Sequence, residues 1–433
     1  MTTTTGRERT PAAAGPLAQS QNLTVTDWKT TIALGIFAII AIVLFIGFGR
    51  DGDSTFSFTS NQTDVIALPT LAIPARGFGI FVAVVAVLMA AGSALLTRTR
   101  RKTPMWYIAI YALLLLIALL AWATVGNTLP VTGLLAGSLA LSVPLIFGAM
   151  GGVLSERGGV VNIAIEGQLL AGAFVSAVVA STTHSVIAGL LAAMVAGTLV
   201  SFILAAFSIK YFVDQVIVGV VLNVLVLGLT NFLYTSILAN DAATLNSPAQ
   251  LPTLAIPGLS AIPVLGPVLF NQTIIVYLMY IAVAVVSYGL FFTRWGLRLR
   301  SVGEHPQAAD TVGINVNSTR FWNVSLGGAI VGLGGAYFTL GSVGAFTEDV
   351  TSGAGYIALA AVIFGRWNPI RATLAALLFG FANNLQSVLG ILGSPIPSDF
   401  LLMLPYLVTI IAVAGLIGQS RAPGADGKPY IKS

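Results

Sequence analysis

The sequence predicts an all-α polytopic membrane protein, and two observations lead to this fold class. Only 8% of the residues are charged while 56% are hydrophobic, whereas a soluble domain has about one quarter of its residues charged. The apolar residues form repeated runs of about twenty, the length that a helix needs to cross a bilayer, and they do not alternate as in a membrane barrel. The mean hydropathy of +0.93 agrees with this class.

The apolar runs predict about 11–12 hydrophobic segments. They are 30–49, 77–96, 105–124, 132–152, 160–180, 186–209, 216–238, 271–293, 320–340, 354–366, 371–389 and 400–418. Segment 354–366 is too short to cross alone, so we expect a re-entrant or broken helix together with 371–389. We expect a disordered tail over 1–27, an extension with about three membrane helices over 28–130, a core over 131–418 and a C-terminal tail over 419–433.

The positions of lysine and arginine predict the orientation of the segments. If the segments alternate, one side collects Arg7, Arg9, Lys29, the run 98–102, Lys210, Arg294, Arg298, Arg300, Arg320, Arg366, Arg371, Arg421, Lys428 and Lys432. The other side has only Arg50 and Arg76, together with most of the loop acids. Because cytoplasmic loops are enriched in lysine and arginine, both termini should be cytoplasmic. The pI of about 9.5 therefore reflects topology and does not indicate a nucleic acid partner.

The polar residues are too few for catalysis or for a resident cofactor. The chain has no cysteine, and its two histidines, His184 and His305, are far apart in sequence, so we expect no metal centre. We find no Ser-His-Asp or paired-carboxylate constellation and expect no catalytic residue. The stretch GADGKP near the C-terminus lacks the spacing and the Ser/Thr of a phosphate-binding loop.

A first charged stretch, GVLSERGGVVNIAIEG at 152–167, lies between two apolar runs. Glu166 follows Asn162 by four residues, so on a helix both would share one face. Glu166 either pairs with Arg157, caps backbone N–H groups near a helix break, contacts a solute or carries a proton. Gly167 and its neighbouring glycines predict a bend or close packing, and broken helices near the midplane are where transporters place solute sites.

A second stretch, 351–388, contains two short apolar pieces separated by Trp367, Asn368 and Pro369. Asn383 and Asn384 follow in the next apolar piece, where buried amides bond either a neutral polar solute or a neighbouring helix. The glycines between 327 and 335 predict close helix packing. The candidate residues for a solute pathway or helix break are therefore Asn162, Glu166, Gly167, Trp367, Asn383 and Asn384.

A third stretch, RWGLRLRSVGEHPQAADTVGIN at 294–315, is an expected cytoplasmic loop. Pro306 suits the first turn of a short helix. An apolar face beside Glu304 and Asp310 would consist of Ala308, Ala309 and Val312. The stretch is either a docking surface or a solvated loop whose basic residues fix the topology.

Together these motifs resemble the permease subunits of bacterial ABC importers, in the group that serves branched-chain amino acids, ribose-type sugars and nucleosides. The nucleoside branch commonly shows SERxGVVNIGxEG and GYIALAAVIFGRWNP. Here Ser155–Gly167 and Gly355–Pro369 carry both motifs, with Ala164 where glycine is frequent. The resemblance covers roughly 131–418, and it gives no function for the 28–130 extension.

The resemblance implies that the third stretch docks on an ATPase as a coupling helix near 303–313. The implied coupling residues are Gly296, Arg298, Arg300, Gly303, Glu304, Pro306, Ala308, Ala309 and Gly313. It also implies two ATP-binding subunits that hold ATP and Mg, a second permease subunit, an extracytoplasmic substrate-binding lipoprotein and a place in the bacterial cytoplasmic membrane. The implied solute is a nucleoside, although a sugar would fit as well.

Two other functions remain open at this point. A secondary transporter driven by an ion gradient would suit about twelve segments and would need Glu166 as its ionisable relay. A membrane-embedded enzyme should present several converging acids, bases or metal ligands, and the sequence offers too few such residues. A structural scaffold would contain buried polar groups that have no function.

Overall fold

The computed structural model describes residues 28–59, 68–403 and 421–432. The predicted tail over 1–27 and most of the predicted segment 400–418 lie outside the described residues. The described part contains 10 helices that are long and apolar enough to cross a membrane, which confirms the predicted fold class. They are α1 with η1 (Lys29–Gly47), α2 (Ala75–Arg98), α3 (Met105–Ala123), α4 (Val131–Arg157), α5 (Ile165–Thr183), α6 with η2 (Val186–Lys210), α7 with η3 (Gln215–Leu238), α9 (Ile274–Phe292), α12 with η5 (Val316–Val343) and α14 (Pro369–Ile391).

Shorter elements connect these helices. The short helices are α8 (Ala242–Leu245), η4 (Gly266–Phe270), α10 (Arg294–Glu304), α11 (Pro306–Thr311) and α13 (Ala354–Phe364). The strands are β1 (Asp53–Ser57), β2 (Leu71–Pro74), β3 (Thr128–Pro130), β4 (Thr253–Ala255) and β5 (Asn271–Thr273). With 11 residues, α13 is too short to cross a bilayer, and it is separate from α14, as the sequence predicted.

The described residues form two compact units, of which the first contains residues 28–50 and 76–119. Its helices α1, α2 and α3 pack through Leu34, Ala86 and Tyr111, and the Tyr111 hydroxyl donates to the Leu34 carbonyl at 2.7 Å. The Thr31 hydroxyl lies 3.0 Å from that of Ser93. The unit is therefore held by apolar packing and by hydroxyl hydrogen bonds between helices.

The second unit contains the described residues 51–59, 68–75, 120–403 and 421–432. Its first part is a three-stranded sheet in which β1 pairs with β2 in antiparallel and with β3 in parallel. This pairing assigns both 51–75 and 120–130 to the second unit, although the sequence placed them in the extension over 28–130. The sheet was not predicted, because strands of three to five residues are too short to show alternation.

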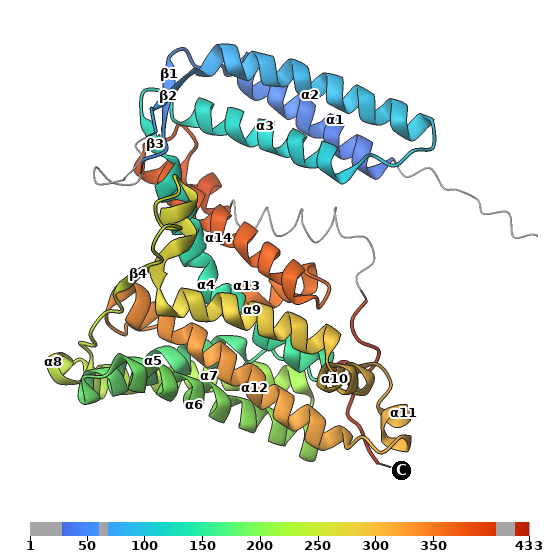
Figure 1. Ribbon diagram of the computed structural model, residues 1–433, viewed down its shortest axis with the longest axis vertical. Helices are drawn as coiled ribbons and strands as arrows, with labels where there is room; N and C mark the ends of the chain where they lie inside the picture. The colour runs from blue at the N-terminus through green and yellow to red at the C-terminus, as the bar shows by residue number, and fades with distance from the viewer. Residues whose placement is uncertain (1–27, 60–67, 404–420, 433) are drawn as a thin grey trace, which may run out of the picture. The chain divides into compact units, whose positions relative to one another are not determined.

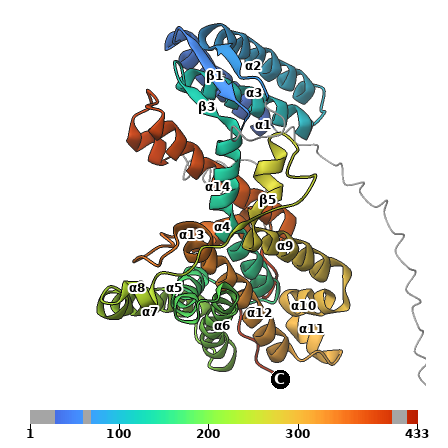
Figure 2. The same ribbon diagram turned by 60° about the vertical axis from the view of Figure 1, so that its left-hand side comes forward.

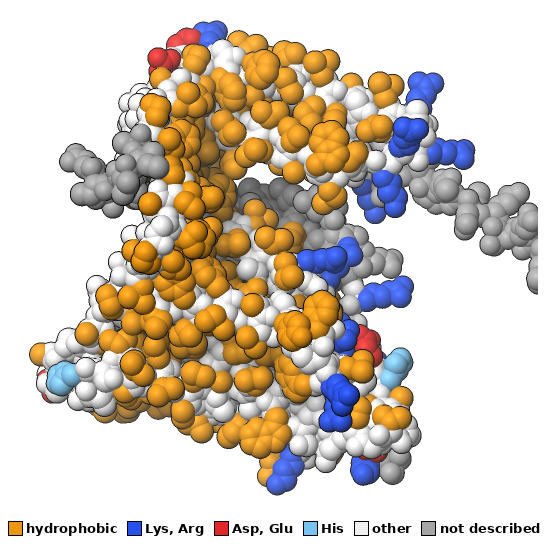
Figure 3. Space-filling view, in the orientation of Figure 1, with side chains coloured by type: hydrophobic (Ala, Val, Ile, Leu, Met, Phe, Trp, Pro, Cys, Tyr) orange, Lys and Arg blue, Asp and Glu red, His pale blue; other side chains and the backbone are white. Residues whose placement is uncertain are grey.

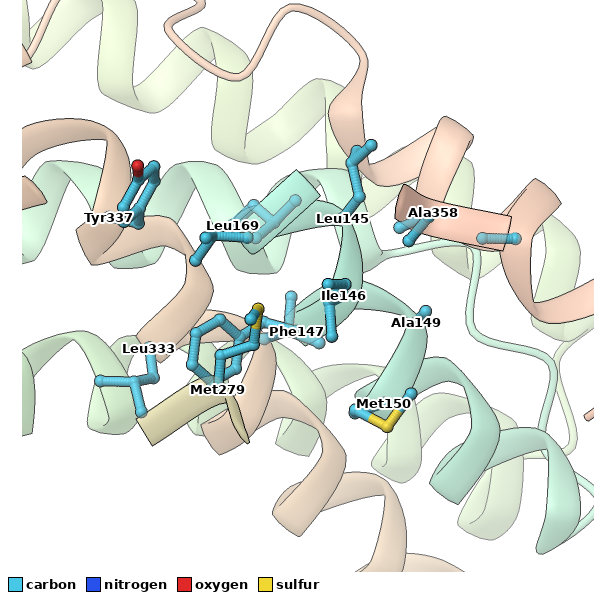
Figure 4. Packing of buried hydrophobic residues seen from close by; sticks show 14 of the residues in the cluster. Leu145, Ile146, Phe147, Ala149, Met150, Leu169, Met279, Leu333, Tyr337 and Ala358 are labelled. Atoms are coloured by element: carbon cyan, nitrogen blue, oxygen red, sulfur yellow. The ribbon is translucent and has the colours of Figure 1, made fainter. Parts of the chain in front are cut away.

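Helix α4 is the central element of the second unit and packs against α9, α12, α13 and α14 (Figures 1 and 2). Its residues Ile146, Phe147 and Met150 are fully buried. Figure 4 shows these side chains meeting Leu169 of α5, Met279 of α9 and others from α12 and α13. The apolar run of α4 is therefore the centre of the core and not a lipid-facing surface.

Glycines bring α5, α6 and α12 into close contact, as the sequence predicted. A Cβ added at Gly197 would lie 2.1 Å from the carbonyl oxygen of Gly328, and one at Gly332 would lie 2.2 Å from that of Ala193. A Cβ at Gly172 would lie 2.2 Å from the Gly332 oxygen. Only glycine permits these backbone approaches, which are typical of membrane helices.

The face of the second unit that Figure 3 shows is largely hydrophobic. On α7, for example, Val220, Val224 and Leu225 are exposed, as expected for side chains that contact lipid. The lysine and arginine side chains of this unit collect at the end that carries α10 and α11 (Figure 3). This asymmetry agrees with the charge pattern of the sequence.

Candidate solute site and docking surface

Helix α4 ends in a left-handed glycine. Gly159 has φ +84°, its N–H donates to the Glu156 carbonyl at 2.9 Å, and the N–H of Val160 donates to the Ser155 carbonyl at 3.1 Å. These two bonds form the Schellman motif that ends helices at glycine. A Cβ at Gly159 would also lie 2.7 Å from the Arg320 guanidinium, so two constraints require glycine here.

The residues 160–164 form a buried loop. The sequence placed Asn162 and Glu166 on one helical face, and this is wrong because α5 begins only at residue 165. The Asn162 amide exchanges two hydrogen bonds of 3.2 Å with Gln168 and donates to the Ser155 hydroxyl at 3.4 Å. These bonds satisfy a polar loop inside an apolar core.

Glu166 caps the first turn of α13. Its carboxylate accepts from the Thr351 hydroxyl at 2.5 Å, from Gly353 N–H at 2.9 Å and from Gly355 N–H at 2.5 Å. Helix N-termini carry unpaired N–H groups and a partial positive charge, so a carboxylate stabilises them. Of the alternatives that the sequence left open, the structure shows the backbone cap, whereas Arg157 contacts other groups.

The N-terminus of α13 lies half-way along α4. An added Cβ at Gly148 would contact Ala358 and one at Gly152 would contact Val362, so the two helices run in parallel with a constant offset of 210 residues. This offset places the first residue of α13 level with residue 144, the midpoint of α4. At 1.5 Å per residue, that level is about 20 Å from either end of α4, a helix that is long and apolar enough to cross a membrane.

Asn223 of α7 links the N-terminal ends of α5 and α13. It accepts from Gly167 N–H at 2.8 Å and donates to the Ile163 carbonyl at 2.9 Å and the Tyr356 hydroxyl at 3.1 Å. Glu166 is 8% exposed and Asn223 4%, whereas Tyr356 is 48% exposed. The buried polar cluster therefore reaches the surface of this unit at the tyrosine.

The turn between α13 and α14 is fixed by the end of α4. Arg366 and Trp367 have φ of 54° and 53°, a region that costs non-glycine residues energy. The Arg157 guanidinium donates to the carbonyls of Trp367 at 2.9 Å and of Arg366 at 3.4 Å. The Trp367 indole donates to the Glu156 carboxylate. Trp367 is thus a buried link between helices, 6% exposed.

The two asparagines of α14 lie elsewhere. Asn384 donates to the Leu134 carbonyl at 2.7 Å and to the Ser138 hydroxyl at 3.4 Å, and its neighbour Asn383 is half-buried. Since 18 residues of α4 separate Ser138 from Glu156, these asparagines are about 27 Å along the helix from the Trp367 link. The contacts of Asn384 are those of helix packing.

The residues of the predicted coupling segment differ in their exposure. Gly296, Gly303, Pro306 and Ala309 are buried, Arg300 is half-buried, and Arg298, Glu304, Ala308 and Gly313 are exposed. A Cβ at Gly303 would lie 2.1 Å from the Arg157 carbonyl oxygen, and one at Gly296 would lie 2.2 Å from that of Gly289. The glycines therefore hold α10 against α4 and α9. A partner protein can contact only the residues that are not buried.

The predicted common face of Ala308, Ala309 and Val312 is wrong. Ala309 is 2% exposed and packs with Val302 and Tyr430, whereas Val312 is 75% exposed. Adjacent residues of a helix do not share a face, so Ala308 is exposed on α11 while Ala309 is buried, and Val312 lies just beyond the end of the helix.

The C-terminal residues 421–432 pack against α10, α11 and α12 of the second unit, a contact that the sequence reasoning missed. The Arg320 guanidinium is 2% exposed and donates to the carbonyls of Lys428 at 2.8 Å, Gly158 at 3.1 Å and Ala425 at 3.4 Å. A buried arginine among apolar residues was the only sequence signal for this contact, because a buried charge requires partners.

Asp426 lies in this C-terminal segment beside Arg320 and Glu156. Burial raises the pKa of Asp426 from its ordinary 3.8 to about 7, while the Gly427 N–H and the Arg320 charge act in the opposite direction. The folded chain thus binds the Asp426 proton more tightly than the unfolded chain does. Its contribution to stability is complete below about pH 4 and is lost as the pH rises through about 7.

We therefore expect Asp426→Asn to flatten the pH dependence of stability. The melting temperature of the wild-type chain should fall between about pH 4 and about pH 7, and that of the variant, which mimics the neutral acid, should fall less. Thermal unfolding of both purified chains in one detergent measures this difference. Parallel profiles would contradict a protonated Asp426.

The architecture defines a class of protein. The described residues contain ten candidate spanning helices, and in the second unit a half-length helix, α13, packs against α4, α5 and α14 with its N-terminus capped by a carboxylate. Interrupted helices of this kind are found in membrane transporters. Among the described residues, no group of three or more His, Asp or Glu could hold a metal ion.

Residues 134–413 match the family described as branched-chain amino acid transport system / permease component. The chain belongs to this family, which confirms the resemblance.

Curated relatives agree with this assignment. The chain is 44% identical over 304 residues to the guanosine ABC transporter permease protein NupQ of Bacillus subtilis, covering 68% of this chain and 95% of that protein. It is 43% identical over 316 residues to the nucleoside ABC transporter permease protein NupC of Lactococcus lactis, covering 71% and 98%. The putative glucose ABC transporter permease protein TsgC13 of Haloferax volcanii is 33% identical over 258 residues, covering 59% and 77%. No solved structure matches the chain.

Proposed function

We propose that this chain is a permease subunit of an ATP-driven importer for nucleosides. The observation that carries the proposal is the match over nearly the full length of NupQ and NupC, whose names describe guanosine and nucleoside permeases. NupP and NupB, the similarly named permeases of the same two organisms, also match the chain, which supports a second permease subunit. Two ATP-binding subunits with ATP and Mg and a substrate-binding lipoprotein complete the proposed importer.

In this proposal, movement of the ATPase reaches the half-helix through a continuous set of contacts. Helix α10 contacts the end of α4 through Gly303 and through the ion pair of Glu304 and Arg157 at 3.9 Å. The Arg157 side chain bonds the turn that contains Trp367, and that turn directly follows α13. A shift of α10 therefore changes the position of α13, since packed contacts transmit motion between sites.

The proposed solute path passes the exposed side of the polar cluster around Glu166 and Gly167. Tyr356 offers an aromatic ring beside the amide of Asn223, and a nucleoside needs both stacking and hydrogen bonds. Asn162 supports the loop behind this face, so its role in the path is indirect. The packing contacts of Asn384 and the link made by Trp367 support a role for these two residues in the framework of the path.

The end of the second unit with α10 and α11 faces the cytoplasm in this proposal. The enrichment of lysine and arginine at that end (Figure 3) supports this orientation. The C-terminal segment lies at the same end, because Ala425 N–H donates to the Gly303 carbonyl at 2.8 Å. Both termini would then be cytoplasmic, and the chain would lie in the bacterial cytoplasmic membrane.

Cross-linking tests the docking surface sharply, because the chain has no cysteine. Ala308→Cys, on the exposed side of α11, should cross-link to the ATPase subunit in the assembled complex. Ala243→Cys, exposed on α8, is the matched control and should not, since Figure 1 shows α8 and α11 at opposite ends of the second unit. A cross-link from α8 and none from α11 would contradict the assignment.

Tyr356 variants test the solute class. Tyr356→Ala should raise the KM of the complex for guanosine roughly tenfold, because stacking of a base on an aromatic ring contributes about 1–3 kcal/mol. Tyr356→Phe retains the ring and should stay near wild type. The measurement is labelled uptake into proteoliposomes, with glucose as competitor. Competition by glucose and an unchanged KM in Tyr356→Ala would indicate a sugar permease instead.

A further inference from the structure

The C-terminal strap, residues Arg421–Lys432, connects parts of the second unit that the proposed mechanism moves. Gly424 N–H donates to the Glu304 carboxylate at 3.0 Å, and Ala425 N–H donates to the Gly303 carbonyl at 2.8 Å. Both partners belong to the last turn of α10. The strap therefore bonds directly to the element that contacts the end of α4.

Further along the strap, Tyr430 packs on α11 and α12. Its side chain is 6% exposed and lies in a cluster with Val302, Ala309 and Val316. Ala309 is the buried side of α11, a helix of six residues that is too short to be stable alone. The tyrosine thus covers the buried side of α11, which is opposite the exposed Ala308.

Arg320 keeps the strap in place. Its buried guanidinium donates to two strap carbonyls, those of Ala425 and Lys428, and to Gly158 at the end of α4. Departure of the strap would leave a buried charge short of two acceptors, which is costly. One buried side chain therefore holds the strap and the helix break together.

We propose that the strap is a positioning element for the ATPase docking surface, which couples α10 and α11 to the end of α4. This inference rests on the proposed function. When ATPase subunits move α11, the strap makes α10, α11 and the start of α12 shift as one body. Without the strap, α11 shifts relative to α10 and does not displace α4. ATP is then hydrolysed without transport.

The test compares two neighbouring strap residues in the complete importer reconstituted in liposomes. Tyr430→Ala removes the buried ring, whereas Ile431→Ala truncates a side chain that is 71% exposed. The ratio of solute imported to ATP hydrolysed should fall at least about fivefold in Tyr430→Ala, the lower end of measured couplings between sites. It should stay at the wild-type value in Ile431→Ala and recover in Tyr430→Phe.

A second pair of variants serves if Tyr430→Ala does not assemble. One chain ends after Pro429 and the other after Tyr430, so they differ by the buried residue alone. The proposal is supported if only the shorter chain loses coupling. It is also supported if only the shorter chain loses the ATPase subunits from an otherwise intact permease pair. Equal ratios in the two chains overturn it. Wild-type complex that imports solute without ATP would instead overturn the proposed function, so the two failures are distinguishable.

Discussion

Glu166→Ala should abolish uptake and destabilise the start of α13. Three donors lose their acceptor at once, namely the Thr351 hydroxyl and the N–H groups of Gly353 and Gly355. Each buried donor that is left unpaired costs about 1–3 kcal/mol, and a helix N-terminus at mid-membrane has no water to replace the carboxylate. Hydrogen exchange of the peptide 351–357 and uptake by the assembled complex measure the two effects.

Glu348→Ala is the matched control for this variant. It removes an exposed carboxylate from the segment that precedes α13, and it should leave the exchange of 351–357 unchanged. Glu166→Gln keeps one acceptor oxygen and should fall between wild type and Glu166→Ala. Protected amides at 353 and 355 in Glu166→Ala would show that the carboxylate does not hold the half-helix.

Gly303→Ala should separate ATP hydrolysis from uptake. The new Cβ would lie 2.1 Å from the Arg157 carbonyl oxygen, a backbone atom that cannot move without shifting the end of α4. Overpacking of this kind costs about 1–3 kcal/mol, and it displaces α10 from the contact that passes motion to the Trp367 turn. We expect continued ATP hydrolysis with uptake reduced at least about fivefold.

The control for Gly303→Ala is a glycine with open space. A Cβ at Gly35 of α1 meets nothing within 4 Å, so Gly35→Ala should leave both activities at wild-type values. Both variants are measured in the same reconstituted complex. Normal coupling in Gly303→Ala would mean that the contact between α10 and α4 carries no motion.

The sequence predicted the membrane helices well, because segment length and apolarity determine them locally. It also located the interruption at Trp367 and Pro369, where proline starts α14 and the Asn368 side chain caps it at 3.2 Å. The residues 160–164 were placed in a helix because they are apolar. The left-handed Gly159 and the bonds of Asn162 prevent this, and neither is visible as a periodic pattern.

The partners of the site residues could not be predicted. Glu166 caps backbone groups 187 and 189 positions away in sequence, and Arg320 bonds the strap across 105 and 108 positions. Such pairs depend on the packing of distant helices and leave no local signal. The strap itself is short and irregular, and its contacts, such as the burial of Ala425 and Tyr430 and the bonds from Arg320, leave no pattern in the sequence.

Uptake by the purified chain and by the assembled complex tests the central claim most directly. Labelled guanosine is supplied to proteoliposomes that contain either this chain alone under a proton gradient, or the complex of both permeases, the ATPase subunits and the binding protein with ATP. We predict uptake only by the complex and only with ATP. Uptake by the single chain that follows the proton gradient would contradict the account and would identify a secondary transporter.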